Sequence, residues 1–181
     1  MTHGVLWPSD SLDFESKYLT TIKDYTLMKK IINFYRQHNL YGEFSNFYQA
    51  HIEINGSIWP TTEHYFQAQK FPNNPEIMKM IQEAETPGTA ARLGRSRSFP
   101  LRKDWEQVKD GVMLDALRAK FTQHPHLKEL LLKTADACLV EHTRNDSYWG
   151  DGGDGSGKNM LGLLLMKLRS ELEENSEWVV C

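Results

Sequence analysis

The stretch WPTTEHYFQAQKF, residues 59–71, carries one carboxylate, Glu63, and one amine, Lys70, among aromatic and amide side chains. Its Pro-Thr-Thr opening is typical of a helix start. On such a helix Glu63, Gln67 and Lys70 stand at i, i+4 and i+7, so they share one face. A carboxylate held beside an amine could supply an acid or base and a nucleophile. The alternative is a solvated helix face, with Glu63 stabilised by the helix dipole.

A second group of chemically useful residues lies in the loop 145–159, NDSYWGDGGDGSGKN. Its five glycines could let backbone N–H groups converge on an anion, which predicts a phosphate cradle with Gly155 and Asn159 among the binding residues. Asp146, Tyr148 and Trp149 suit a nucleoside pocket, with hydroxyl contacts and base stacking. A polar loop whose tryptophan covers the core explains the same residues equally well.

Two further segments supply candidate binding residues. In GEFSNF, 42–47, Phe44 could anchor a loop that presents the hydrogen-bonding groups of Ser45 and Asn46 to a substrate. An ordinary turn is the alternative. Trp105, near the start of a long predicted helix, is either a core residue or a platform on which a base stacks.

The composition argues against a strongly basic nucleic-acid-binding protein and against a small disulfide-rich protein. The chain of 181 residues is 40% hydrophobic and 25% charged, with a net charge of -3, so no global basic field attracts nucleic acid. A local basic cluster is either a solvated surface or a phosphate site; its members are Arg92, Arg95, Arg97, Arg102 and Lys103. Two cysteines give no disulfide framework.

Other motifs are absent from the sequence. The glycine-rich loop is not a Walker A motif, because Asn159 follows Lys158, and it lacks the ligand spacing of an EF-hand. We expect neither a metal site nor a cofactor. The start of the chain has no signal-peptide pattern, and the longest apolar run, LGLLLM, is far too short to span a bilayer. A cytoplasmic protein without a membrane partner is expected.

The hydrophobic pattern predicts a mainly α-helical α+β single domain with a few short strands. Strands are expected at 31–35 and 138–143, and a hairpin is expected around the dipeptide Asn55-Gly56. Helices are expected from about 62, at 75–85, 87–94, 104–123 and 126–134, and finally at 160–174. We expect an N-terminal extension over 1–29, the domain over 30–174 and a C-terminal tail over 175–181.

Four long motifs resemble one known family. GEFSNF, WPTTEHYFQAQKF, RKDWEQVKDGVMLDALRAKF and LVEHTRNDSYWGDGGDGSGKNMLGLLLM are similar, in this order, to the YbiA-like NADAR family, from about Ile31 to Leu172. The resemblance implies an N-glycosidase that cleaves a bond between ribose and an exocyclic amine. The implied substrates are ribosylamino-pyrimidine phosphates of riboflavin biosynthesis and ADP-ribose joined to the guanine amino group. It also implies functional roles for Glu63, Trp105 and Asp146, and a role for Lys70 in the same helix.

The chemistry of such a substrate allows two routes. In one, Glu63 or Asp146 activates water while the other stabilises charge or protonates the leaving amine. In the other, a neutral Lys70 attacks the sugar carbon and forms a Schiff base that water hydrolyses. The substrate would be a nucleotide or phospho-sugar, and ADP-ribosylated DNA or RNA is a candidate partner. The alternative function is an ADP-ribose or nucleotide-binding module that does not cleave its ligand.

Overall fold

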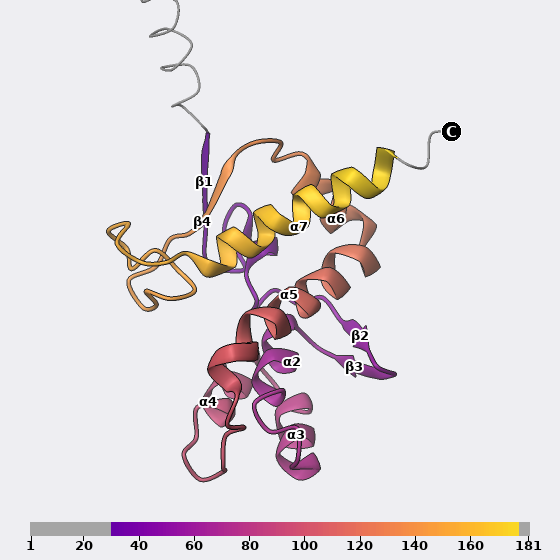
Figure 1. The fold of residues 1–181 in the computed structure, drawn as a ribbon, viewed down its shortest axis with the longest axis vertical. Helices are drawn as coiled ribbons and strands as arrows, with labels where there is room; N and C mark the ends of the chain where they lie inside the picture. Colours follow the sequence, from indigo (N-terminus) through magenta and orange to yellow (C-terminus); the bar gives the residue numbers. More distant parts are fainter. Residues whose placement is uncertain (1–29, 178–181) are drawn as a thin grey trace, which may run out of the picture. The chain divides into compact units, whose positions relative to one another are not determined.

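The computed structural model describes residues 30–177, and it describes side chains as far as 174 (Figure 1). The predicted extension 1–29 and residues 178–181 lie outside this part. The described elements are β1 (Ile31–Phe34), the 3-10 helix η1 (Gly42–Phe44), β2 (Ile52–Ile54), β3 (Ser57–Trp59), α2 (Thr62–Ala68), α3 (Pro75–Gln82), α4 (Pro87–Gly94), α5 (Trp105–Gln123), α6 (Pro125–Leu132), β4 (Cys138–Glu141) and α7 (Met160–Glu177). The predicted mainly helical α+β class is confirmed.

The strands form two separate pairs. β1 and β4 run parallel, with Ile31 opposite Cys138 and Phe34 opposite Glu141. β2 and β3 form the predicted antiparallel hairpin. Its turn residues Asn55 and Gly56 have φ angles of 52° and 75°, the left-handed region that a tight two-residue hairpin turn needs.

Short polar residues begin the helices where the sequence predicts. Thr61 caps α2 by accepting a hydrogen bond from the backbone N–H of His64 at 3.3 Å. Asn74 and Thr86 cap α3 and α4 in the same way, each followed by a proline in the first turn. α3 ends at Gln82, earlier than the predicted 85, and α7 continues past the predicted 174 to Glu177.

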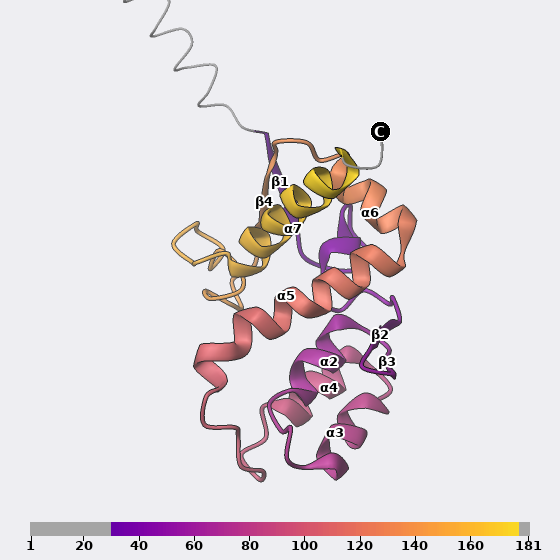
Figure 2. The ribbon, with the colours of Figure 1, turned by 45° about the vertical axis from the view of Figure 1, so that its right-hand side comes forward.

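The long helix α5 lies between two groups of elements in both ribbon views (Figures 1 and 2). On one side are β1, β4, α6 and α7, and on the other are α2, α3, α4 and the hairpin. Each group has its own buried apolar cluster, and Val112 of α5 packs against both clusters. None of the helices described between residues 30 and 177 is long and apolar enough to cross a membrane.

Candidate active site

A cavity of about 270 Å³ lies where α2 and α5 meet the loops that follow η1 and β4. It brings together Glu63, Lys70, Trp105 and Asp146, the four side chains that sequence reasoning proposed as catalytic. The complete lining is Ser45, Asn46, Phe47, Glu63, Phe66, Gln67, Lys70, Arg95, Trp105, Glu106, Lys109, Met113, Glu141, Asp146, Tyr148 and Trp149. Residues more than 100 positions apart in the chain therefore line one cavity.

Glu63 is held firmly at the start of α2. Its backbone N–H donates to the carbonyl of Asn46 at 3.2 Å, and its Oε1 accepts a hydrogen bond from Gln67 Nε2 at 2.7 Å. Only 5% of the residue is exposed. Burial raises the pKa of Glu63, while the Gln67 hydrogen bond and the positive charge of Lys70 oppose the rise. The carboxyl group is therefore easier to protonate than an exposed glutamate.

Lys70 lies two residues beyond the end of α2, but its backbone continues the helical turn. Its N–H donates to the carbonyl of Gln67 at 3.3 Å, which keeps the side chain on the same side as Glu63. The amine donates to the Gly94 carbonyl at 3.3 Å and forms no direct ion pair with a described carboxylate. Burial lowers the pKa of Lys70 to about 8, Glu63 opposes this, and Arg95 and Arg97 add to it.

Aromatic rings form the wall beside the amine. The Lys70 Nζ lies 5.5 Å from the centre of the Trp105 ring and 5.7 Å from that of Phe66. The Phe66 ring contacts Trp105 and Trp149, with centroid distances of 5.0 and 5.2 Å. Trp105 is 6% exposed and belongs to the apolar core, and it also lines the cavity. The core role is confirmed, while the stacking of a base on the face that lines the cavity stays a prediction.

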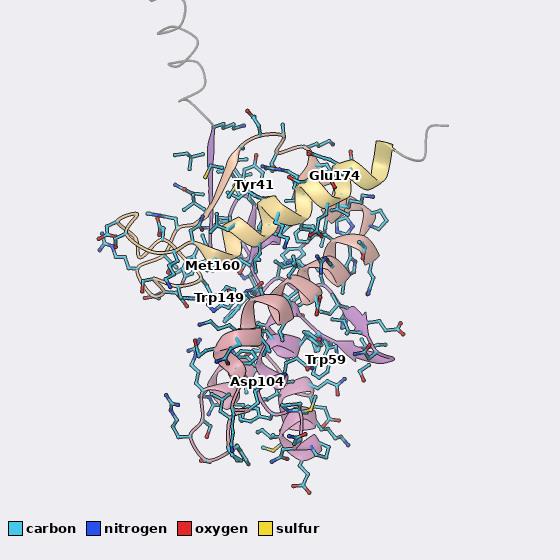
Figure 3. The ribbon with its side chains drawn as sticks, viewed as in Figure 1. Tyr41, Trp59, Asp104, Trp149, Met160 and Glu174 are labelled. Atoms are coloured by element: carbon cyan, nitrogen blue, oxygen red, sulfur yellow. The ribbon has the colours of Figure 1, made fainter. Side chains whose placement is uncertain are left out.

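Asp146 is oriented by the backbone of its own loop. Its Oδ1 accepts hydrogen bonds from the N–H groups of Tyr148 and Trp149 at 2.8 and 2.7 Å. Its Oδ2 accepts none from the described residues. Figure 3 labels Trp149 just below Met160, the first residue of α7, and the Trp149 carbonyl accepts from the second residue of that helix at 3.1 Å. The loop that carries Asp146 is thus fixed to α7.

Glu141 is a further carboxylate in the cavity besides Glu63, Asp146 and Glu106, and sequence reasoning missed it. It is the last residue of β4, and burial raises its pKa to about 7, with Asp146 and Glu63 adding to the rise. Its backbone N–H donates to Asn159 Oδ1 at 2.9 Å. A glutamate at the end of a partly buried strand, five residues before a candidate aspartate, was the available signal.

A family model described as the NADAR domain matches residues 33–173. The chain belongs to the NADAR family. The N-glycosidase YbiA of Escherichia coli K12 is 57% identical over 148 residues, which cover 82% of this chain and 92% of that protein. The chloroplastic riboflavin biosynthesis protein PYRR of Zea mays is 46% identical over 156 residues, 78% of this chain and 25% of that longer protein. The NMR structure of Escherichia coli YbiA matches with a TM-score of 0.77 at 56% identity, covering 83% of this chain and 89% of that chain.

The glycine-rich loop of this NADAR chain does not offer its N–H groups to a ligand. The N–H of Gly153 donates to Asp151 Oδ1 at 2.8 Å, and those of Gly155 and Gly157 donate to the Asp151 carbonyl at 3.1 and 2.8 Å. Asn159 is engaged as well, because its amide also donates to the Leu139 carbonyl at 2.8 Å. Gly155 and Asn159 lie outside the cavity lining, so we leave both out of the proposed site.

Of the other candidates, Ser45, Asn46 and Tyr148 line the cavity and Phe44 does not. Phe44 is fully buried, and its ring packs against those of Phe34 and Phe121. It anchors the loop from the core side and cannot reach a substrate.

A buried lysine supports that loop from the opposite direction. Lys120 of α5 is fully buried and donates from Nζ to the Ser45 carbonyl at 2.9 Å. Burial lowers its pKa to about 7. Asn46 in turn accepts from the Thr62 hydroxyl at 3.2 Å, which leaves its amide N–H groups without a partner among the described residues. Among residues 30–177, no cluster of three or more His, Cys, Asp or Glu side chains is arranged to hold a metal ion.

Proposed function

We propose that this NADAR protein is an N-glycosidase that hydrolyses the bond between ribose and an exocyclic amine. The observation that carries the proposal is a buried carboxyl, Glu63, and a half-buried amine, Lys70, which line one cavity together with Asp146. A protein that only binds a nucleotide needs no amine of lowered pKa, so the site favours catalysis over a binding module. The names of the relatives, N-glycosidase and riboflavin biosynthesis protein, support the same reaction.

We propose two substrate classes that contain this bond. Ribosylamino-pyrimidine phosphates of riboflavin biosynthesis are supported by the name of the maize relative. ADP-ribose joined to the guanine amino group, free or in DNA or RNA, presents the same ribose carbon and the same kind of nitrogen. Ser45, Asn46, Tyr148 and Trp149 are proposed to contact the substrate, because all four line the cavity.

The proposed reaction begins with opening of the glycosylamine to an imine at C1 of the ribose. The neutral Lys70 amine adds to C1, and a proton passes to the departing nitrogen. Glu63, a buried acid of raised pKa in the same cavity, is proposed to supply that proton. The C1–N bond then breaks and releases the base with its free amino group, which leaves a Schiff base between C1 and Lys70. Water adds to C1 and releases the sugar as an aldehyde, and Lys70 recovers its amine. One water is consumed for each bond broken.

The test is incubation with both substrate classes while the released amine is followed by mass spectrometry. Glu63→Gln keeps the shape and the hydrogen bond with Gln67 but removes the ionisable group, so turnover should fall by about 10²-fold or more. Glu76→Gln is the matched control, because Glu76 also lies in the first turn of a helix and is exposed. If Glu63→Gln turns over substrate as fast as the control, Glu63 has no part in the mechanism. If the wild type releases no amine from either substrate, the proposed function is wrong.

A further inference from the structure

A second hollow opens beside the catalytic cavity, and it has a volume of about 410 Å³. Its lining is Lys70, Phe71, Gly94, Arg95, Ser96, Arg97, Phe99, Leu101, Trp105 and Glu106. Lys70, Arg95 and Trp105 line both spaces, as does Glu106. A molecule whose reacting carbon faces Lys70 can therefore extend into the second hollow without leaving the surface of the protein.

Two guanidinium groups in this hollow have no carboxylate partner. Arg95 and Arg97 are exposed, and neither side chain forms a hydrogen bond or ion pair with the described residues. By contrast, the guanidinium of nearby Arg102 donates twice to Asp104, at 2.7 and 2.8 Å. The charges of Arg95 and Arg97 both act on Lys70, which places them close to the reacting amine.

The other polar groups of the hollow do not cancel this positive charge. The only carboxylate in its lining is Glu106, which pairs with Lys109. The Ser96 hydroxyl accepts from the N–H of Ser98 at 3.2 Å, so its own O–H remains able to donate. Two free guanidinium groups and a hydroxyl are a donor set that suits a phosphate, because guanidinium binds phosphate oxygens in pairs.

We propose that Arg95, Ser96 and Arg97 bind the phosphate carried by C5 of the substrate ribose, while C1 of the same ribose faces Lys70. This inference rests on the proposed function, and it adds the requirement that the sugar be phosphorylated. Both substrate classes carry a phosphate at this position, as a monoester in one and as part of a pyrophosphate in the other. The subsite explains how one cavity accepts two different bases: the protein recognises the shared sugar phosphate.

The probe is ribose 5-phosphate, compared with ribose, in calorimetric titrations at low salt without any turnover. The wild type should bind ribose 5-phosphate at least tenfold more tightly than ribose, because hydrogen bonds between charged groups are the strong ones. The double variant Arg95→Gln/Arg97→Gln should lose this preference. Arg92→Gln is the control: Arg92 lies in α4, three residues before Arg95, is exposed, and lines neither hollow, so the preference should persist.

The outcome separates this subsite from the proposed reaction. If the double variant, with an unchanged melting temperature, still prefers ribose 5-phosphate tenfold, the arginine subsite is wrong whatever the enzyme cleaves. The single variant Arg97→Gln, in the loop after α4, gives a second reading should the double variant fold poorly. If the preference depends on the arginines but no substrate releases its amine, the subsite stands and the N-glycosidase proposal fails.

Discussion

Lys70 offers the sharpest test of the proposed chemistry, because its amine must lose a proton before it can attack carbon. Burial lowers its pKa from the ordinary 10.5 to about 8. At pH 7 an amine of pKa 8 is neutral in about one molecule in ten, against about one in three thousand for an unperturbed lysine. If attack limits the rate, adduct formation should rise about tenfold between pH 7 and pH 9 and then level off.

The assay is reduction with borohydride during turnover, followed by peptide mapping. Borohydride should convert the Schiff base into a stable sugar adduct on Lys70. Lys70→Arg should abolish both the adduct and turnover, since a guanidinium remains protonated. Lys109→Arg is the matched control in the same cavity: burial lowers the pKa of Lys109, but its hydrogen bond to Glu106 and the nearby Tyr148 raise it by more. Trapping should survive in that variant.

Two results would refute this reasoning. Consumption of substrate without any adduct on Lys70 would remove the covalent step and favour the water route, with Glu63 and Asp146 as the acid and base. A partial loss of turnover in Lys70→Arg would agree with that route, because a fixed cation could then serve to hold the substrate. A rise of about a hundredfold between pH 7 and pH 9 that does not level off would be the behaviour of an ordinary lysine and would contradict the lowered pKa.

Gly94→Ala should reduce turnover, because the added Cβ would collide with Gln67 Oε1 and displace the amide that binds Glu63; Gly88→Ala in the same helix meets nothing closer than 3.8 Å and should leave turnover unchanged. Lys120→Met removes a buried amine that is neutral in the folded protein above about pH 7 and charged in the unfolded chain up to about pH 10.5. The wild-type free energy of unfolding should therefore rise from pH 7 to pH 10 relative to the variant, by at most about 1.4 kcal/mol per pH unit in urea titrations. Plots of the free energy of unfolding against pH that run parallel for the two proteins would contradict the lowered pKa of Lys120. Glu141→Gln removes a carboxyl whose pKa is raised from 4.5 to about 7, so the wild type should lose stability relative to the variant as the pH rises from 4.5 to 7. A difference in the free energy of unfolding that stays constant over this range would contradict the raised pKa.

The sequence predicted the parts of the fold that depend on near neighbours. The hairpin at Asn55-Gly56 follows from two residues that tolerate positive φ. The starts of α2, α3 and α4 follow from capping residues that act over one helical turn. The common cavity of Glu63 and Lys70 follows from helical spacing, although α2 itself ends at Ala68. In each case the deciding interaction spans only a few residues.

The parts that the sequence did not predict depend on distant contacts. Glu141 enters the cavity because β4 pairs with β1, whose residues lie more than 100 positions earlier in the chain. The glycine-rich loop shows the same limit in another form. Glycine spacing indicates backbone freedom, but the hydrogen bonds to Asp151 decide where the N–H groups of Gly153 and Gly157 point. The sequence showed the basic cluster but not which of its side chains are paired. The structure shows that Arg102 forms an ion pair with Asp104, whereas Arg95 lines the second hollow.

Burial links the packing of this fold to its proposed chemistry. It raises the pKa of Glu63 and lowers that of Lys70, so burial favours the neutral form of each group. The desolvating surface beside the amine is made by Phe66 and Trp105, which are also core residues. The Lys70 amine donates its hydrogen bond to the Gly94 carbonyl. Glu63 acts on the same amine through its negative charge, which opposes the lowering of the pKa of Lys70. The same aromatic packing that stabilises the domain therefore also desolvates the Lys70 amine.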